Sequence, residues 1–169
     1  MANTKTVIIK IKRQDNPNAK SHWEEFELTW HPGMNVISSM MEIARNPVTR
    51  DGKPTTPITY DSNCLEEVCG SCAMLINGRA RMACSALIDK LEQPIRLEPF
   101  TKFPVIRDLV TDVSFNYEKA REIPSFAPLK DLQPGEYRMA QEDVERSQEF
   151  RKCIECFMCQ NVCHVIRDH

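Results

Sequence analysis

The placement of the cysteines constrains this sequence more than any other feature. Eight cysteines occur in 169 residues, and they form two groups of four separated by a long stretch without cysteine. Two independent metal sites would produce this arrangement. Disulfides are the alternative, but the opening run MANTKTVIIK lacks the apolar stretch and cleavage site of a secretion signal, and the reducing cytosol disfavours disulfides. The cysteines therefore predict metal chemistry.

The first group lies in the run CLEEVCGSCAMLINGRARMAC, with four, two and eleven residues between successive cysteines. The first two spacings are those of the plant-type 2Fe-2S ferredoxin loop, whose fourth ligand comes from further along the chain. Such a loop needs small residues where the backbone curls over the sulfides, and Gly70, Ser71 and Ala73 let the amides point inward. Structural zinc is the alternative, although zinc ribbons usually pair two tight knuckles. The candidate ligands are Cys64, Cys69, Cys72 and Cys84.

The second group lies in the run CIECFMCQNVC, with two, two and three residues between successive cysteines. This is the bacterial ferredoxin run, in which the first three thiolates bind one 4Fe-4S cube and the fourth binds another cluster. Zinc sites do not use this spacing. Because a cube takes four protein ligands, we interpret the sequence as C-terminally truncated, or as completed by another chain. The candidate ligands are Cys153, Cys156, Cys159 and Cys163.

Charge and composition indicate protein partners. The 22 basic and 24 acidic residues are interspersed and leave a formal charge of -2, which gives no electrostatic reason to expect nucleic acid or anionic lipid. No apolar run reaches the roughly 18 residues that a membrane span needs. The five glycines form no dinucleotide or phosphate loop, and no nucleophile constellation occurs. We therefore expect a soluble, cytoplasmic chain without catalytic residues, whose substrate chemistry belongs to a partner.

The N-terminal part has the pattern of a small α+β domain. Apolar and polar residues alternate at 7–11 and at 26–30, which predicts a hairpin of two half-buried strands. Asn35 is placed to cap a helix, and Asn77-Gly78 predicts a hairpin turn. The order strand, strand, helix, loop, hairpin, strand is that of a β-grasp domain. The further strands are predicted at 73–76, 79–83 and 95–97.

From residue 104 onward the sequence predicts helices. Apolar residues at helical spacing predict one helix at 105–113, and another is expected at 141–152. Three prolines at 121–134 predict an extended connector between them. The fold class is therefore α+β. A β-grasp 2Fe-2S ferredoxin-type domain is expected at 1–103, followed at 104–169 by the N-terminal part of a mainly helical, bacterial-ferredoxin-like 4Fe-4S/3Fe-4S domain.

A plant-type loop followed by a bacterial-type loop is a rare combination. With it, the chain resembles the iron-sulfur subunit of the succinate dehydrogenase and fumarate reductase family, bacterial type, over essentially its whole length. The segments FPVIRDLVTDVSFNYEKAREIPSFAP and CIECFMCQ are similar to that family's linker and second-cluster segments. The resemblance implies transfer of single electrons between the FAD of a flavoprotein subunit and membrane quinone, on the cytoplasmic side of the inner membrane. Its partners would be that flavoprotein and membrane-anchor subunits with quinone, and haem in the anchor is left open.

The resemblance also implies roles for the cysteines. The family usually has proline after the last cysteine of the second run, whereas HVIRDH follows here. Two roles stay open for His164, handling a quinone proton and capping the last cluster loop. The alternatives are the iron-sulfur subunit of another flavoenzyme, such as a thiol-dependent fumarate reductase or a glycolate-oxidase-like carrier, and a structural zinc protein. The resemblance implies that the 2Fe-2S cluster is bound by Cys64, Cys69, Cys72 and Cys84, and that the 4Fe-4S cluster is bound by Cys153, Cys156 and Cys159. It also implies that the 3Fe-4S cluster takes one ligand from Cys163.

Overall fold

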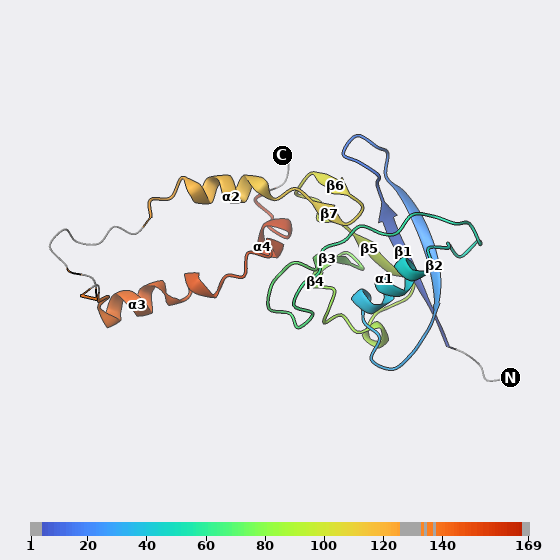
Figure 1. Ribbon diagram of the computed structural model, residues 1–169, viewed down its shortest axis with the longest axis horizontal. Coiled ribbons are helices and arrows are strands. Elements are labelled where there is room, and N and C mark those ends of the chain that lie inside the picture. The colour runs from blue at the N-terminus through green and yellow to red at the C-terminus, as the bar shows by residue number, and fades with distance from the viewer. Residues whose placement is uncertain (1–4, 126–132, 134, 137, 167–169) are drawn as a thin grey trace. The chain divides into compact units, whose positions relative to one another are not determined.

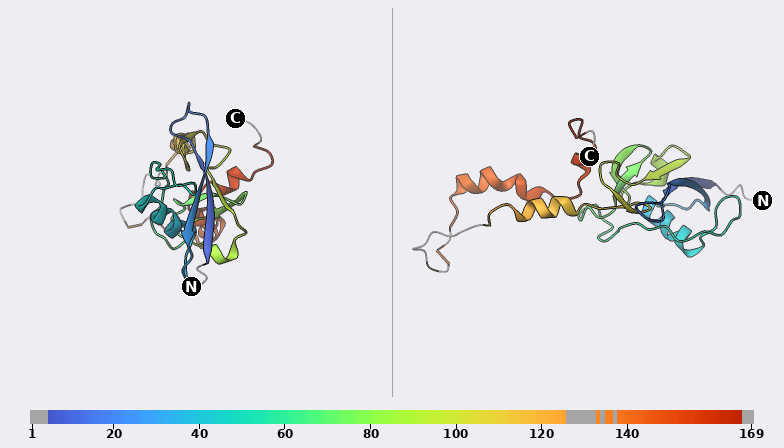
Figure 2. Two further views of the ribbon diagram at one scale, coloured as in Figure 1. Left: turned by 90° about the vertical axis from the view of Figure 1, so that its right-hand side faces the viewer. Right: turned by 90° about the horizontal axis from the view of Figure 1, so that it is seen from above.

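The computed structural model describes residues 5–125, 133, 135–136 and 138–166. Its helices and strands are labelled in Figure 1, and Figure 2 shows them from two further sides. The chain divides into two compact units, Met1–Asp112 together with Glu155–His169, and Val113–Ile154. The first unit therefore contains the N-terminal domain and also most of the second cysteine run.

Five strands build the sheet of the first unit: β1 (Thr6–Arg13), β2 (His22–Thr29), β3 (Ala73–Ile76), β4 (Arg79–Met82) and β5 (Ile95–Glu98). The strand order in the sheet is β2-β1-β5-β3-β4. β1 pairs antiparallel with β2 and parallel with β5, and β3 pairs antiparallel with both β5 and β4. The predicted strands and the β-grasp order are confirmed, although β2 begins earlier than predicted.

The hydrophobic core lies between the sheet and helix α1 (Val36–Arg45). The inward side chains of β1 are fully buried and alternate with partly exposed neighbours, as the period of a strand requires. The predicted cap of α1 is confirmed. Asn35 Oδ1 accepts from the amide of Ser38 at 2.8 Å, and the amide of Asn35 donates to Ser38 Oγ at 3.0 Å. This reciprocal cap satisfies amides that the first turn of a helix leaves unpaired.

The turn between β3 and β4 also agrees with its prediction. Asn77 and Gly78 have φ values of 50° and 75°, and positive values at both positions are what a two-residue hairpin turn requires. The side chain of Asn77 extends the turn to the neighbouring strand. Its Oδ1 accepts from the amide of Arg96 in β5 at 2.7 Å, and its Nδ2 donates to the carbonyl of Glu92 at 2.8 Å.

The helix predicted at 105–113 is wrong. This segment forms a two-stranded hairpin of β6 (Val105–Arg107) and β7 (Val110–Thr111). Asp108 makes the turn with a φ of 45°, in the left-handed region. β-branched residues fit strands better than helices. In addition, the Asp108 carboxylate accepts hydrogen bonds from distant parts of the first unit, which the local spacing of apolar residues could not reveal.

The remaining elements are short helices. α3 (Gln141–Gln148) and the following 3₁₀ turn η2 (Phe150–Lys152) fill the helix predicted at 141–152, whereas α2 (Ser114–Arg121) is not among the predicted elements. Most of the connector predicted at 121–134 lies outside the described residues. None of the helices in the described part of the chain is long and apolar enough to cross a membrane. The last two elements are η1 (Ile88–Lys90) and α4 (Met158–Asn161).

The compact units do not end where the predicted domains end. The predicted division lies between residues 103 and 104, whereas the first unit continues to Asp112 and includes the segment from Glu155 onward. The β6-β7 hairpin extends the unit, because the amide of Asp108 donates to the carbonyl of Gln14 at 2.8 Å, directly after β1. Independent folding of 1–103 and 104–169 stays a prediction.

Candidate iron-sulfur sites

The loop from Cys64 to Cys69 directs backbone amides at sulfur. The Sγ of Cys64 lies 3.5 Å from the amide nitrogen of Glu66, 3.4 Å from that of Val68 and 3.3 Å from that of Cys69. The amide nitrogen of Cys64 lies 3.5 Å from the Sγ of Cys69. These four amides belong to residues that precede Gly70, Ser71 and Ala73, so the inward orientation predicted at those small residues stays a prediction.

The backbone adopts this shape through the left-handed region. Leu65 and Glu67 have φ values of 62° and 64°, and Gly70 has a φ of 79°. Such residues turn neighbouring amides to one side and create a concave nest for an anionic atom. A non-glycine residue in this region costs on the order of 1–3 kcal/mol, and strain of this kind is concentrated at functional sites. The loop is therefore shaped for a negatively charged group.

Hydrogen bonds favour the thiolate of Cys69. Its Sγ lies 3.4 Å from the hydroxyl oxygen of Ser71, and the amides of Cys64 and Ser71 also reach it. The hydrogen bond with the Ser71 hydroxyl, followed by those from the amides, lowers the pKa of Cys69 to about 6. The thiolate is the form of cysteine that binds metals. At neutral pH, Cys69 is therefore prepared as a ligand.

Cys72 and Cys84 form a second pair, which is buried. Cys72 precedes β3 and Cys84 follows β4, and the two residues are 3% and 6% exposed. The amide of Ala83 donates to the carbonyl of Cys72 at 3.1 Å, which holds the ends of the β3-β4 hairpin together and brings the two thiols near each other. Burial raises the pKa of Cys72, because an apolar environment disfavours a thiolate that has no cation beside it.

The four cysteines of the first group are thus arranged as two pairs, Cys64 with Cys69 and Cys72 with Cys84. A 2Fe-2S cluster has two irons, each bound by two protein ligands, so the pairs fit this donor requirement. Zinc instead gathers its four donors around one ion. In the part of the chain that the structure describes, no three His, Cys, Asp or Glu side chains are placed to share one metal ion.

The second cysteine run is divided between the two units. Cys153 is exposed near the end of the unit Val113–Ile154, and the other three cysteines belong to the first unit. Cys156 packs against the hydrophobic core, whereas Cys159 is exposed on α4. Glu155 and Phe157 have φ values of 55° and 56°, so this loop uses the same left-handed conformation as the first. Among the described residues of the first unit, these three thiols are not gathered around one point.

Cys163 follows α4 and has its own set of amide donors. Hydrogen bonds from the amides of Ile166 and Val165, together with the positive charge of Lys102, lower the pKa of Cys163. His164 is exposed in the bend that follows. The two roles considered for His164 stay predictions.

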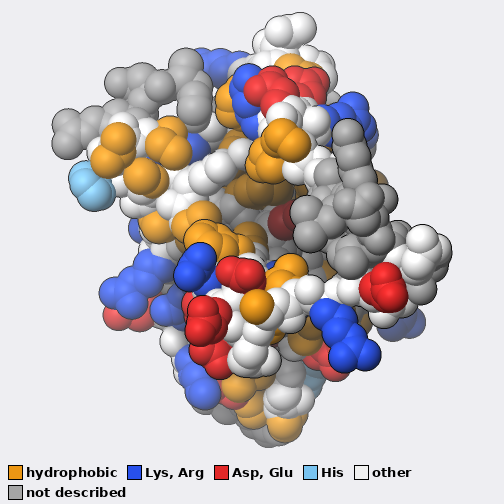
Figure 3. Space-filling model, turned by 90° about the vertical axis from the view of Figure 1, so that its left-hand side faces the viewer, with side chains coloured by type: hydrophobic (Ala, Val, Ile, Leu, Met, Phe, Trp, Pro, Cys, Tyr) orange, Lys and Arg blue, Asp and Glu red, His pale blue; other side chains and the backbone are white. Residues whose placement is uncertain are grey.

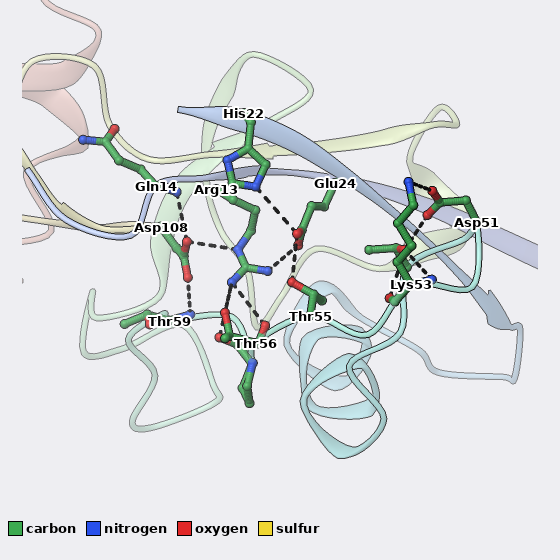
Figure 4. Close-up of polar contacts among 12 residues, drawn as sticks. Arg13, Gln14, His22, Glu24, Asp51, Lys53, Thr55, Thr56, Thr59 and Asp108 are labelled. Carbon is green, nitrogen blue, oxygen red and sulfur yellow. Dashed lines mark hydrogen bonds and ion pairs between the residues drawn. The ribbon is translucent and has the colours of Figure 1, made fainter. Parts of the chain in front are cut away.

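Sequence reasoning missed a buried charge network in the first unit (Figure 4). Arg13 and Asp108 are 2% and 1% exposed, and Arg13 Nε donates to the Asp108 carboxylate at 3.0 Å. Arg13 also donates to Glu24 and to Thr56, while Asp108 accepts from the amide of Thr59 at 2.9 Å. A signal is present in the sequence, because Arg13 continues the inward face of β1 and a buried charge needs a partner. The network anchors the segment that leads into the first cysteine loop.

The family of 2Fe-2S iron-sulfur cluster binding domains matches residues 8–118. This range contains the four cysteines of the first group and nearly all of the five-stranded sheet. Fold, cysteine pairs and family match agree on the class of protein. The chain is an iron-sulfur protein that contains a 2Fe-2S domain of α+β fold.

Comparison with related proteins defines a narrower class of iron-sulfur proteins for this chain. The chain is 46% identical over 166 residues to the succinate dehydrogenase iron-sulfur subunit of Bacillus subtilis, covering 96% of this chain and 65% of that protein. It is 37% identical over 112 residues to the fumarate reductase iron-sulfur subunit of Mycobacterium tuberculosis, covering 64% of this chain and 45% of that one. In the solved structure of the Mycobacterium smegmatis Sdh1 complex in the apo form, one chain is 48% identical with a TM-score of 0.80, covering 98% of this chain and 66% of its own length.

This chain belongs to the family of succinate dehydrogenase and fumarate reductase iron-sulfur subunits. It spans about two thirds of the length of the Bacillus subtilis relative.

Proposed function

We propose that this chain is the electron-transfer subunit of a succinate dehydrogenase or fumarate reductase, passing single electrons between the FAD of a flavoprotein subunit and membrane quinone. The observation that carries the proposal is the first cysteine loop, where paired thiols meet amides that donate toward sulfur. Succinate oxidation releases two electrons together, whereas iron-sulfur clusters accept them singly. A series of clusters therefore suits the step between flavin and quinone.

The proposed ligands follow the two cysteine runs. When bound, a 2Fe-2S cluster supplies one-electron redox chemistry at the first site. The residues of the chain itself prepare that site: the amides of the loop donate to sulfur charge, and the burial of Cys72 and Cys84 excludes water from one side. Hydrogen bonds to sulfur and burial are the means by which a protein sets a cluster potential. The proposed ligands are Cys64, Cys69, Cys72 and Cys84 for 2Fe-2S, Cys153, Cys156 and Cys159 for 4Fe-4S, and Cys163 for 3Fe-4S.

The proposed partners carry the chemistry that this chain lacks. We place the substrate site on the flavoprotein, and quinone and any haem in the membrane-anchor subunits, with this chain bound peripherally on the cytoplasmic side of the inner membrane. Charged side chains of both signs are interspersed on the face drawn in Figure 3. A mixed surface of this kind suits protein partners better than nucleic acid, which favours basic patches.

Two alternatives are less well supported. An iron-sulfur subunit of another flavoenzyme would share both cysteine runs, but the relatives described above are named as succinate dehydrogenase and fumarate reductase subunits. A structural zinc protein would gather its thiolates around one ion, whereas the first four cysteines here form two pairs.

Anaerobic reconstitution of the chain with ferrous iron and sulfide tests the cluster assignment. We expect about two irons and about two acid-labile sulfides to remain bound at the first site, to be lost in Cys69→Ser and to be kept in the control Cys159→Ser, which removes an exposed cysteine of the second run. Zinc without iron or labile sulfide in the protein as isolated would contradict the assignment.

Reduction by succinate tests the electron-transfer role. When a succinate-oxidising flavoprotein subunit is added, succinate should reduce the first cluster and produce its EPR signal. A cluster that dithionite reduces, but that succinate with the flavoprotein does not, would leave the iron-sulfur assignment in place and contradict the proposed partner.

A further inference from the structure

A buried polar side chain joins the second cysteine run to the N-terminal domain. Asn161, the last residue of α4, is 7% exposed and lies between Cys159 and Cys163. Its Oδ1 accepts hydrogen bonds from the amide of Thr101 at 2.9 Å and from the amide of Lys102 at 3.3 Å. One side-chain oxygen therefore satisfies two backbone donors in the segment that follows β5.

Apolar contacts accompany these hydrogen bonds. The ring centroid of Phe157 lies 6.1 Å from that of Phe103, which lies 6.2 Å from that of the buried Phe100. Met158 packs against the hydrophobic core. Apolar packing is not directional, whereas a hydrogen bond weakens steeply at a poor angle. The contacts of Asn161 therefore determine how α4 is oriented on the domain.

This docking brings the second run close to residues of the first site. α4 lies against β4, and Met158 lines one cavity together with Met82, two residues before Cys84, and Ser85, which directly follows Cys84. A displacement of α4 would therefore change the distance between Cys84 and Cys159. The rate of electron transfer between two centres falls steeply as that distance grows.

We propose that Asn161 is a positioning residue that docks the second cysteine run on the N-terminal domain and so sets the separation of the two cluster sites. The effect on clusters rests on the proposed function, but the docking contact belongs to the polypeptide alone. Asn161→Leu keeps the approximate size and removes the oxygen to which the amides of Thr101 and Lys102 both donate. Asn161→Asp keeps an acceptor oxygen.

Hydrogen exchange of the whole chain tests the docking without any cluster. In Asn161→Leu, the peptide covering residues 99–104 should exchange about tenfold faster or more, while peptides from β1 keep their wild-type rates. Asn161→Asp should keep the slow exchange. Val162→Thr is the matched control, because this neighbouring side chain is 64% exposed, and it should leave exchange unchanged. If hydrogen exchange in β1 also becomes faster in Asn161→Leu, that variant disturbs the whole domain. The exchange of residues 99–104 is then compared between the wild type and Asn161→Ala, which adds no bulk.

EPR of reduced protein that holds both clusters tests the effect on their separation. Two paramagnetic clusters at a fixed distance broaden each other's signals, and this broadening should weaken in Asn161→Leu and persist in Asn161→Asp and Val162→Thr. Unchanged exchange at 99–104 in the leucine and alanine variants would overturn the docking role, and unchanged broadening would overturn the effect on separation. If the wild-type chain forms no clusters, the proposed function fails, while hydrogen exchange still decides the role of Asn161.

Discussion

Replacement of Asp108 by alanine tests whether the buried charge network holds the N-terminal domain together. The carboxylate accepts hydrogen bonds from Arg13 Nε at 3.0 Å, from the amide of Gln14 at 3.0 Å and from the amide of Thr59 at 2.9 Å. The side chain of Arg13 is 3% exposed in this pair, and that of Asp108 is fully buried. Asp108→Ala therefore removes the partner of a buried cation and of two amides at once.

The magnitude follows from these contacts. Removing one partner of a buried ion pair costs about 3–5 kcal/mol, and leaving a buried amide without an acceptor costs about 1–3 kcal/mol. These costs do not add fully, because Arg13 keeps its hydrogen bonds to Glu24 and Thr56 and water can enter the space of the lost carboxylate. We therefore expect the free energy of unfolding to fall by about 3–5 kcal/mol, out of a total that is typically about 5–15 kcal/mol.

Urea unfolding followed by tryptophan fluorescence measures this loss. Trp23 lies in β2 and Trp30 directly follows it, so the signal reports on the sheet, and the loss should appear as a lower midpoint at unchanged slope. Asp51→Ala is the control, because Asp51 pairs with Lys53 at 2.6 Å on the surface (Figure 4) and its removal should leave the midpoint unchanged. A wild-type midpoint for Asp108→Ala, or the same shift in both variants, would refute the reasoning.

Three further measurements test the sites and the fold. Cys84→Ser should deplete iron at the first cluster far more than at the second, and equal loss of both EPR signals would contradict the two-site assignment. The hydrogen bond between His31 and Glu42, at 2.7 Å, raises the pKa of His31. Its stabilisation is therefore present below about pH 6.5 and is lost as the pH rises through the higher folded pKa. His31→Gln should remove this part of the pH dependence of unfolding, and an NMR titration of His31 at its ordinary pKa would count against it. Limited proteolysis should release a stable fragment that extends to Asp112, whereas a stable fragment ending near residue 103 would support the division predicted from the sequence.

The strands, the cap and the turn could be predicted because their causes are local. The inward residues of β1 alternate with outward ones over a few positions, Asn35 caps the turn that directly follows it, and Asn77-Gly78 needs only its own two positive φ values. The cysteine spacings are local in the same sense. They predicted a 2Fe-2S loop, and the family of 2Fe-2S iron-sulfur cluster binding domains matches residues 8–118.

Features that depend on distant partners could not be predicted in this way. Asp108 adopts a left-handed turn among contacts from Gln14 and Thr59, which are far away in sequence, and a helical spacing of apolar residues next to it was therefore misleading. The sequence also does not show which cysteines of the first group form pairs. Asn161 gives almost no signal, because an asparagine between two cysteines does not reveal the amides of Thr101 and Lys102 that it binds.

The parallel pairing of β1 with β5 affects the order in which the ribosome can complete this domain. β5 occupies the place between β1 and β3 in the sheet, with Ile9 opposite Ile95 and Ile11 opposite Leu97. A nascent chain can form the β1-β2 hairpin early, because that pairing is local, but β5 is synthesised only after Cys84 and the three cysteines before it. Until then the sheet is open and the thiols of Cys72 and Cys84 are not yet buried. A ribosome stalled before Ile95 should therefore present all four thiols to an alkylating reagent, and one stalled well beyond Glu98 should protect the last two.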